Sequence, residues 1–206
     1  MDTKTYHLKV TFMTPVLGTQ PQKDVASEYI ASKVSERNES SPPIPMAEGL
    51  AADELASLSE ELERGTTAFH KRDGKPIFYD YQIKGFLKDA ATVFNGKGGM
   101  PKNFRSKVDN LVFPKPRQIE LHLPDSAEIT FCERPLRAMT AQGPRTSLAR
   151  SEELPAGTWF ECDLRVYPGE IGEREIRELM SYGEDKGLGQ WRNGGKGRIE
   201  FELDAK

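Results

Sequence analysis

The order of its periodic segments is the feature that most constrains the fold of this chain. In Tyr6–Phe12 every second residue is apolar, as in a strand with one buried face. Residues 81–94 instead place apolar side chains three or four positions apart, which predicts an amphipathic helix that Asp80 is placed to cap. Short strand patterns follow at 119–123 and 129–132.

The same order then recurs in the second half of the chain. Residues 158–167 predict a strand, 173–184 a helix and 198–203 a last strand. The helix pattern depends on three inward-facing residues, Ile176, Leu179 and Met180. Two successive strand–helix–strand runs are typical of an α+β, ferredoxin-like (RRM-like) fold, in which helices cover one face of an antiparallel sheet. We therefore expect a single domain over residues 1–206.

Three segments interrupt this pattern. Residues 20–65 carry ten acidic and four basic residues and predict an acidic insertion of loops and short helices. Residues 95–116 contain glycines and prolines without regular periodicity, so we expect them to be irregular. Residues 134–150 contain helix formers interrupted by a Gly-Pro pair, which predicts an extended loop or a hairpin.

The distribution of charge says more about function than its total. The 206 residues include 29 basic and 32 acidic ones, a net charge of −3 that argues weakly against nucleic acid. Residues 97–117, however, hold six basic residues against Asp109 alone, and 134–150 hold four arginines and no acid. Arginines in loops favour phosphate contact, because the guanidinium fork matches phosphate oxygens. The alternative is solvated charge scattered over separate faces.

A glycine-rich loop, GLGQWRNGGKG from Gly187 to Gly197, precedes the last strand. Glycines allow positive φ and close approach of the backbone to a ligand, and successive exposed N–H groups can hold an anion. Trp191 offers a face on which a base can stack. The loop is neither a Walker A loop nor a dinucleotide fingerprint, because a strand and not a helix follows it. The alternative is a helix-to-strand connection that tolerates glycine.

Three basic segments supply the candidate nucleic-acid-binding residues: first the glycine-rich loop together with Arg198, second residues 97–117 and third residues 134–150. They are Lys102, Arg105, Lys107, Arg137, Arg145, Arg150, Gly189, Trp191, Arg192, Gly194, Gly195, Lys196, Gly197 and Arg198. The partner that they predict is RNA or another single-stranded nucleic acid.

Three stretches resemble the RAMP superfamily, the repeat-associated proteins of CRISPR systems. The run GLGQWRNGGKGRIEFEL (187–203) resembles the family's G-rich loop, and TSLARSEELPAGTWFECDLRVY (146–167) is similar to a segment of its backbone-forming members. The run YDYQIKGFLKDAA (79–91) is similar to its first helix, although Ala91 or Thr92 stands where the family often has arginine. The acidic segment 20–65 is not part of this resemblance, which fits an insertion.

The resemblance implies a ferredoxin-like fold with the G-rich loop between the last helix and the last strand. It also implies RNA binding, but it specifies neither a particular complex nor a CRISPR locus, and a stand-alone or virus-borne relative would show the same motifs. Our own expectation is a subunit of a nucleoprotein assembly, CRISPR-related or virus-borne, with self-association or other protein subunits. An acidic segment that meets a basic partner leaves a second function open, that of a protein-interaction subunit or a mimic that docks on a nucleoprotein complex.

Catalytic residues are hard to find in the sequence. His70 lies in a basic loop and is the candidate for a third function, a metal-independent endoribonuclease. Asp73, Asp80 and Asp109 are the loop aspartates that a metal-dependent relative would use. Strand positions opposite the apolar faces predict solvent-facing side chains for the remaining histidines, His7 and His122. We favour a protein without catalytic residues, cofactor or bound metal.

The remaining residues bear on compartment and on packing. Two separated cysteines, Cys132 and Cys162, fit a reduced, cytoplasmic protein, and no signal peptide or membrane helix is evident. Phe104 is expected either to stack on a base or to anchor its loop in the core. Tyr79 and Tyr81 are expected at the core or its rim.

Overall fold

A computed structural model describes residues 3–21, 66–140 and 143–206, with the backbone alone at 21, 136–140 and 143–148. The chain forms two compact units. The first comprises Met1–Gly18, Phe69–Thr130 and Glu153–Lys206, and the second comprises Thr19–Ala68 and Phe131–Glu152. The acidic segment expected at 20–65 lies, from residue 22 onward, outside the described residues, and so do its two helical patterns.

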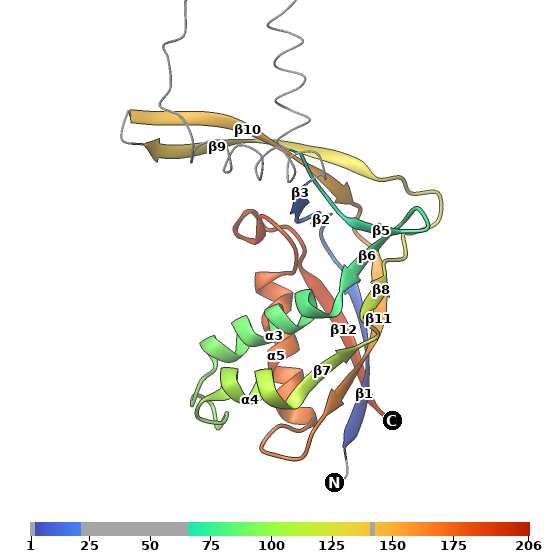
Figure 1. Ribbon diagram of the computed structural model, residues 1–206, viewed down its shortest axis with the longest axis vertical. Helices are drawn as coiled ribbons and strands as arrows, with labels where there is room; N and C mark the ends of the chain where they lie inside the picture. Colours follow the sequence, from blue (N-terminus) through green and yellow to red (C-terminus); the bar gives the residue numbers. More distant parts are fainter. Residues whose placement is uncertain (1–2, 22–65, 141–142) are drawn as a thin grey trace, which may run out of the picture. The chain divides into compact units, whose positions relative to one another are not determined.

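A four-stranded antiparallel sheet forms the centre of the first unit (Figure 1). Its strands are β1 (Lys4–Phe12), β7 (Val112–Lys115), β11 (Trp159–Val166) and β12 (Ile199–Ala205). They lie in the order β12-β1-β11-β7, and every neighbouring pair is antiparallel. Along the chain, helix α3 (Asp80–Val93) lies between β1 and β7, with short strands before it and a further helix after it, and α5 (Glu173–Lys186) lies between β11 and β12. This is the ferredoxin-like α+β arrangement, as the order of sequence patterns predicts.

The inner strands alternate as their sequences predict. Leu8 and Val10 of β1 are fully buried, whereas the alternate residues His7 and Lys9 are partly exposed. In β11 the even-numbered residues 160–166 are all buried, and Leu8 pairs with Cys162 in register. One face of the sheet therefore supplies the core, and the other carries mostly polar side chains.

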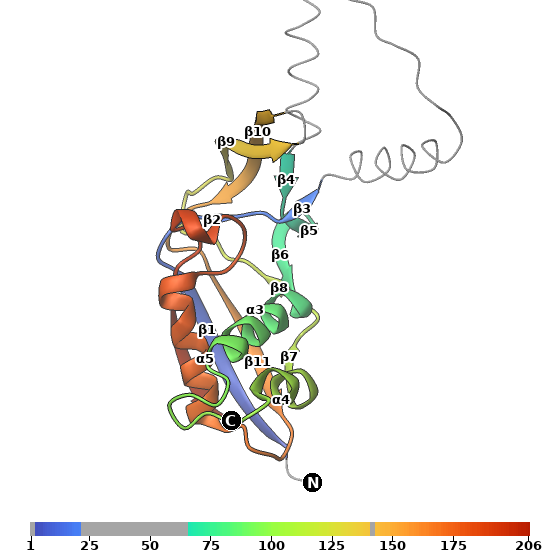
Figure 2. The same ribbon diagram turned by 90° about the vertical axis from the view of Figure 1, so that its left-hand side faces the viewer.

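The helices cover the core face. Figures 1 and 2 both show α3, α5 and α4 (Phe104–Leu111) on the same side of the sheet. Tyr79 and not Asp80 caps α3: the Tyr79 N–H donates to the Gln82 side chain at 2.8 Å, and Asp80 is the first helical residue. Asp80 accepts instead from the N–H of Tyr81 at 2.8 Å.

Residues 95–116 are more regular than expected, because they contain α4 and β7. Two buried side chains, Phe104 and Val108, anchor α4 one turn apart. The Asn95 side chain accepts a hydrogen bond from the Phe104 N–H at the start of the helix. At its end the Lys84 ammonium donates to the carbonyls of Val108, Asp109 and Val112. Contacts from α3 and its following loop thus define both ends of a helix too short to be stable alone.

A smaller sheet completes the first unit. It consists of β5 (His70–Arg72), β6 (Lys75–Tyr79) and β8 (Gln118–Glu120), in the order β5-β6-β8. Strand β2 (Val16–Leu17) pairs separately with residues 153–154. The strand expected at 119–123 is therefore present, although it is short and lies outside the central sheet.

In the second unit, two paired strands run through residues 134–150, which agrees with the hairpin, one of the two alternatives expected there. Strand β9 (Thr130–Thr140) pairs with β10 (Gly143–Leu154). Strand β10 also pairs in parallel with β4 (Thr66–Ala68), and β4 pairs with β3 (Gln20–Pro21). The buried Arg134 donates to the Ser151 hydroxyl at 3.1 Å.

Candidate nucleic-acid interface

The glycine-rich loop folds back on its own protein. The Leu188 N–H donates to the Gly197 carbonyl at 2.8 Å, which joins the two limbs of the loop at their base. The Gly197 N–H donates to the Pro15 carbonyl at 2.9 Å, and the Arg198 N–H donates to the Thr14 hydroxyl at 2.9 Å. These amides are engaged within the protein, so they are not available to hold an anion in this conformation.

Several glycines of the loop are required by this folding, and Gly197 and Gly189 are two of them. Gly197 has φ of +73°, and a Cβ added there would lie 1.8 Å from the Leu188 carbonyl oxygen. Gly189 has φ of +87°, and its Cβ would lie 2.8 Å from Val16. Gly195, by contrast, has φ of +79° and nothing within 4 Å of an added Cβ. Close contact between protein segments therefore explains Gly189 and Gly197, and Gly195 at the open tip is required only by its backbone conformation.

Trp191 stands at the start of the short 3-10 turn η1 (Arg192–Gly194). Its backbone is left-handed, with φ of +56°, and its side chain is exposed. The indole lies against Gly194, where an added Cβ would come within 2.7 Å of the ring. One face of the indole thus packs on the loop. The residue is nevertheless 41% exposed, so a ligand can reach part of it.

The two cations of the loop, Arg192 and Lys196, are bound to carboxylates, and Arg198, which directly follows the loop, is not bound to any described carboxylate. The Arg192 guanidinium contacts Asp89 of α3 at 3.0 Å, and the Lys196 ammonium contacts Glu153 at 2.7 Å. The Lys196–Glu153 pair is about four-fifths buried on both sides, so it fastens the loop to the end of β10. Arg198 is exposed and forms no ion pair with any described residue.

The second basic segment lies at the other end of α5. Arg174 in the first turn of α5 donates to the Gly98 carbonyl, whereas Lys186 in its last turn donates to Asn193 of the glycine-rich loop. Arg174 and Lys186 are twelve positions apart in α5, which corresponds to about 18 Å along the helix axis. The two contacts therefore lie at opposite ends of the helix, whose course Figures 1 and 2 show. The structure therefore does not gather these two segments at one point.

The cations of this second segment are mostly open. Lys102 and Arg105 are exposed and have no carboxylate within ion-pair distance among the described residues. Lys107 instead contacts Glu170 at 2.7 Å. Phe104 is fully buried, so it anchors α4 in the core and does not present a ring for stacking.

The third basic segment belongs to the second unit. The Arg150 guanidinium lies 4.1 Å from the Phe131 ring centre and 3.5 Å from a carboxylate oxygen of Glu133. Arg137 lies in β9 and Arg145 in β10, but their side chains are outside the described residues. Arg150 is thus a stacked and partly paired cation.

The catalytic candidates have structural partners. The His70 ring meets Tyr79 edge-on at 4.6 Å, and its Nε2 lies 3.2 Å from the Tyr81 hydroxyl. Burial lowers the pKa of His70, which favours the neutral ring at pH 7. Asp73 sits in the turn between β5 and β6 with a left-handed backbone. The Lys88 ammonium donates to Asp109 at 2.8 Å and lowers the pKa of that carboxyl.

The other two histidines face the uncovered side of the sheet, as expected. His7 Nδ1 lies 3.1 Å from Asp163, and the His122 ring stacks on Trp159 at 4.3 Å. Among the residues that the structure describes, no group of three or more histidine, cysteine or acidic side chains could hold a metal ion.

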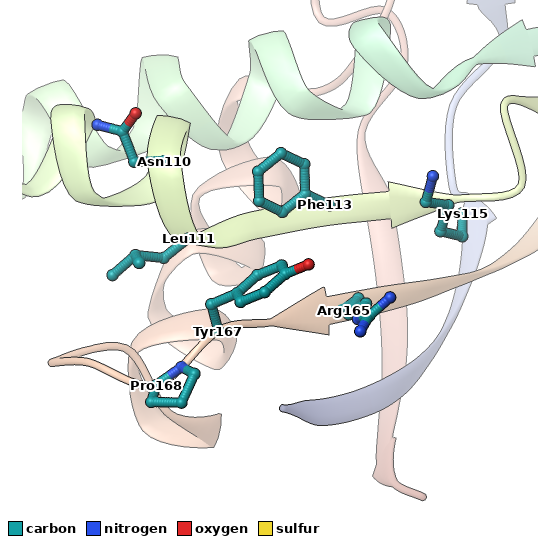
Figure 3. A pocket seen from close by; sticks show the side chains of 7 residues that line it. All are labelled: Asn110, Leu111, Phe113, Lys115, Arg165, Tyr167 and Pro168. Carbon is teal, nitrogen blue, oxygen red and sulfur yellow. The ribbon is translucent and has the colours of Figure 1, made fainter. Parts of the chain in front are cut away.

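Sequence reasoning missed an open cleft at the β7 edge of the central sheet. Figure 3 shows the residues that line it, which come from the end of α4, from β7 and from the end of β11. They are Asn110, Leu111, Phe113, Lys115, Arg165, Tyr167 and Pro168, around a volume of about 410 Å³. The signal in the sequence is alternation, since Phe113 and Lys115, like Arg165 and Tyr167, are two positions apart.

Comparison with solved structures identifies similar folds. Among 136 matching chains is one from the cryo-EM structure of the type III-B Cmr-beta bound to cognate target RNA. The match has a TM-score of 0.52 at 13% identity and covers 98% of this chain and 60% of that one. This chain thus spans less than two thirds of the length of its structural neighbour.

Sequence comparisons found no relatives. No protein-family model matches the chain, and no curated protein matches it. Within the described part of the chain, none of the helices combines the length and the apolar character that a bilayer crossing requires.

Proposed function

We propose that this chain is a non-catalytic, RAMP-like RNA-binding subunit of a nucleoprotein assembly. The observation that carries the proposal is the fold likeness, over 98% of this chain, to a chain from a structure determined with target RNA bound. This likeness concerns the fold alone. The three RAMP-like sequence motifs are the separate support for an RNA-binding function.

Local electrostatics support the same proposal. Lys102, Arg105 and Arg198 are exposed cations whose charges no described carboxylate neutralises within ion-pair distance. Such cations contribute most to the binding free energy of a polyanion, because its phosphates displace only water and counterions from them. Arg192 and Lys196 contribute less, because a phosphate must compete there with Asp89 and Glu153.

The proposal predicts a specific salt dependence. We would titrate a labelled 20-nucleotide single-stranded RNA by fluorescence anisotropy at several salt concentrations. Each lost phosphate contact lowers the slope of log K against log salt by about 0.7 for single strands. The double variant Lys102→Ala/Arg105→Ala is therefore expected to lower the slope by about 1.4, and Arg198→Ala by about 0.7.

A charge-matched control separates specific contacts from overall charge. Lys75→Ala removes one cation that is already bound to Glu120 on the small sheet, and it is expected to leave the slope unchanged. The proposal fails if the parent protein does not bind the RNA at micromolar concentration, or binds it with an affinity independent of salt. Assembly into multi-subunit particles that ignores RNA, measured by mass photometry, would favour the protein-interaction function instead.

A further inference from the structure

The cleft at the β7 edge combines two exposed aromatic rings at a corner of the uncovered sheet face. Phe113 and Tyr167 are 38% and 37% exposed, and their ring centres lie 5.6 Å apart in an edge-to-face arrangement. Figure 3 shows the Tyr167 ring beside Phe113, with Lys115 and Arg165 farther along the same two strands. Lys84 lies over one face of the Phe113 ring and Arg165 over one face of the Tyr167 ring, so a third planar group would stack on ring surface that these cations leave open.

The two rings are held in place from behind. The Tyr167 N–H donates to the Leu111 carbonyl at 2.9 Å, which fixes the end of β11 against the end of α4. The Lys84 ammonium lies 4.3 Å from the Phe113 ring centre while it donates to carbonyls at the end of α4. Rings fixed in this way lose little freedom when a ligand stacks on them.

Two cations adjoin the rings without a carboxylate of their own. Lys115 pairs in register with Asp163, but Lys206 and His7 already occupy the Asp163 carboxylate. The Arg165 guanidinium lies 5.2 Å from the Tyr167 ring centre and forms no ion pair with any described residue. A ligand with an anionic group next to its planar ring could stack on the aromatic side chains and bind the two cations at the same time.

We propose that this cleft binds one nucleotide of a single-stranded RNA, with its base stacked on Phe113 and Tyr167 and its phosphate held by Lys115 and Arg165. This inference rests on the proposed function and adds a site that the glycine-rich loop does not include. The volume of about 410 Å³ lies in the range of ligand pockets. The Asn110 amide nitrogen donates to the Ser106 carbonyl, which leaves the amide oxygen as an acceptor at the rim.

The experiment compares one RNA with its abasic analogue. The probes are a 20-nucleotide single-stranded RNA and a strand of equal length and phosphate count that lacks bases. Tyr167→Ala is expected to weaken binding of the RNA about fivefold or more, the value of one stacked base, and to leave the abasic strand unaffected. Arg165→Gln is expected to weaken binding of both strands, because it removes a phosphate contact.

Two variants keep the result interpretable. Tyr167→Phe retains the ring and is expected to bind the RNA as the parent does, whereas a loss equal to that of Tyr167→Ala would overturn the stacking role. Tyr81→Ala removes an exposed tyrosine, 55% exposed, outside the cleft, and is expected to leave affinity unchanged. Ultraviolet crosslinking followed by mass spectrometry is expected to place the RNA on the peptides that contain Phe113 or Tyr167.

The outcomes distinguish this site from the general function. If the parent binds RNA but Tyr167→Ala binds equally well and crosslinks lie elsewhere, the cleft is not a nucleotide site and the proposed function stands. If the parent does not bind RNA, both proposals fail. If Tyr167→Ala changes only the oligomeric state measured by sedimentation, the cleft contacts protein and the inference is overturned.

Discussion

Gly197→Ala is expected to destabilise the protein far more than Gly195→Ala, although the two glycines stand two positions apart with nearly equal φ of +73° and +79°. Both substitutions place an alanine in the left-handed region, at a cost of about 1–2 kcal/mol. Only at Gly197 does the new methyl group also meet the protein, 1.8 Å from the Leu188 carbonyl oxygen.

The size of the extra cost follows from what must move. Real Cβ atoms essentially never approach another heavy atom closer than 3.0 Å, so the two limbs of the loop must separate by about 1.2 Å. That movement breaks the hydrogen bond from Leu188 to Gly197 and strains the one from Gly197 to Pro15. At about 1 kcal/mol each, the two bonds bring the expected loss for Gly197→Ala to about 3–4 kcal/mol.

Urea denaturation of the two variants and the parent measures this difference. With a slope of about 2 kcal/mol per molar urea, Gly197→Ala is expected to lower the midpoint by about 1.5–2 M and Gly195→Ala by about 0.5–1 M. Equal midpoints for the two variants would refute the reasoning, because they would show that the loop opens at no cost. Such an opening would also return the loop amides to solvent, where an anion could reach them.

Two further predictions concern other parts of the first unit. Lys84→Met removes the donor to three carbonyls at the end of α4 and is expected to cost about 2–3 kcal/mol in urea, whereas Lys88→Met, which loses only a surface contact, is expected to cost less than about 1 kcal/mol. Burial, and secondarily the Asp163 charge, raises the pKa of the Cys162 thiol from 9.0 to about 12. In Cys132→Ser protein a thiol reagent at pH 8 is expected to react at least about a thousandfold faster after denaturation, and equal rates would contradict burial. Because the folded pKa is the higher one, this thiol's contribution to stability is complete below about pH 9 and is lost progressively as the pH rises through about 12.

Elements with a long, one-sided pattern are predictable from the sequence, and elements completed by distant contacts are not. Helices α3 and α5 show apolar spacing over 14 residues each, and β1 alternates over its whole length. Helix α4 has only Phe104 and Val108 to signal it, and both of its ends depend on side chains of other segments. No local pattern could show that helix.

The same distinction applies to the candidate interface. A count of charges identifies Arg192 and Lys196 as cations, but their carboxylate partners Asp89 and Glu153 are 103 and 43 positions away in the chain. Sequence alone therefore cannot separate cations that are already neutralised from those, such as Arg198, that remain open. Likewise, Phe113 becomes a surface ring only because β7 forms the edge of the sheet.

The outermost strand on the opposite edge, β12, carries Glu200, Glu202 and Asp204 on the same uncovered face. Three strand spacings place this row about 14 Å from β7. That distance exceeds the Debye length of about 8 Å in physiological salt but is well within the length of about 30 Å at 0.01 M. A lower salt concentration therefore strengthens two opposing effects on an RNA phosphate: repulsion by the acidic row on β12 and attraction by the cations at the β7 edge. An ionic-strength titration over this face would consequently report fewer phosphates than actually touch the protein.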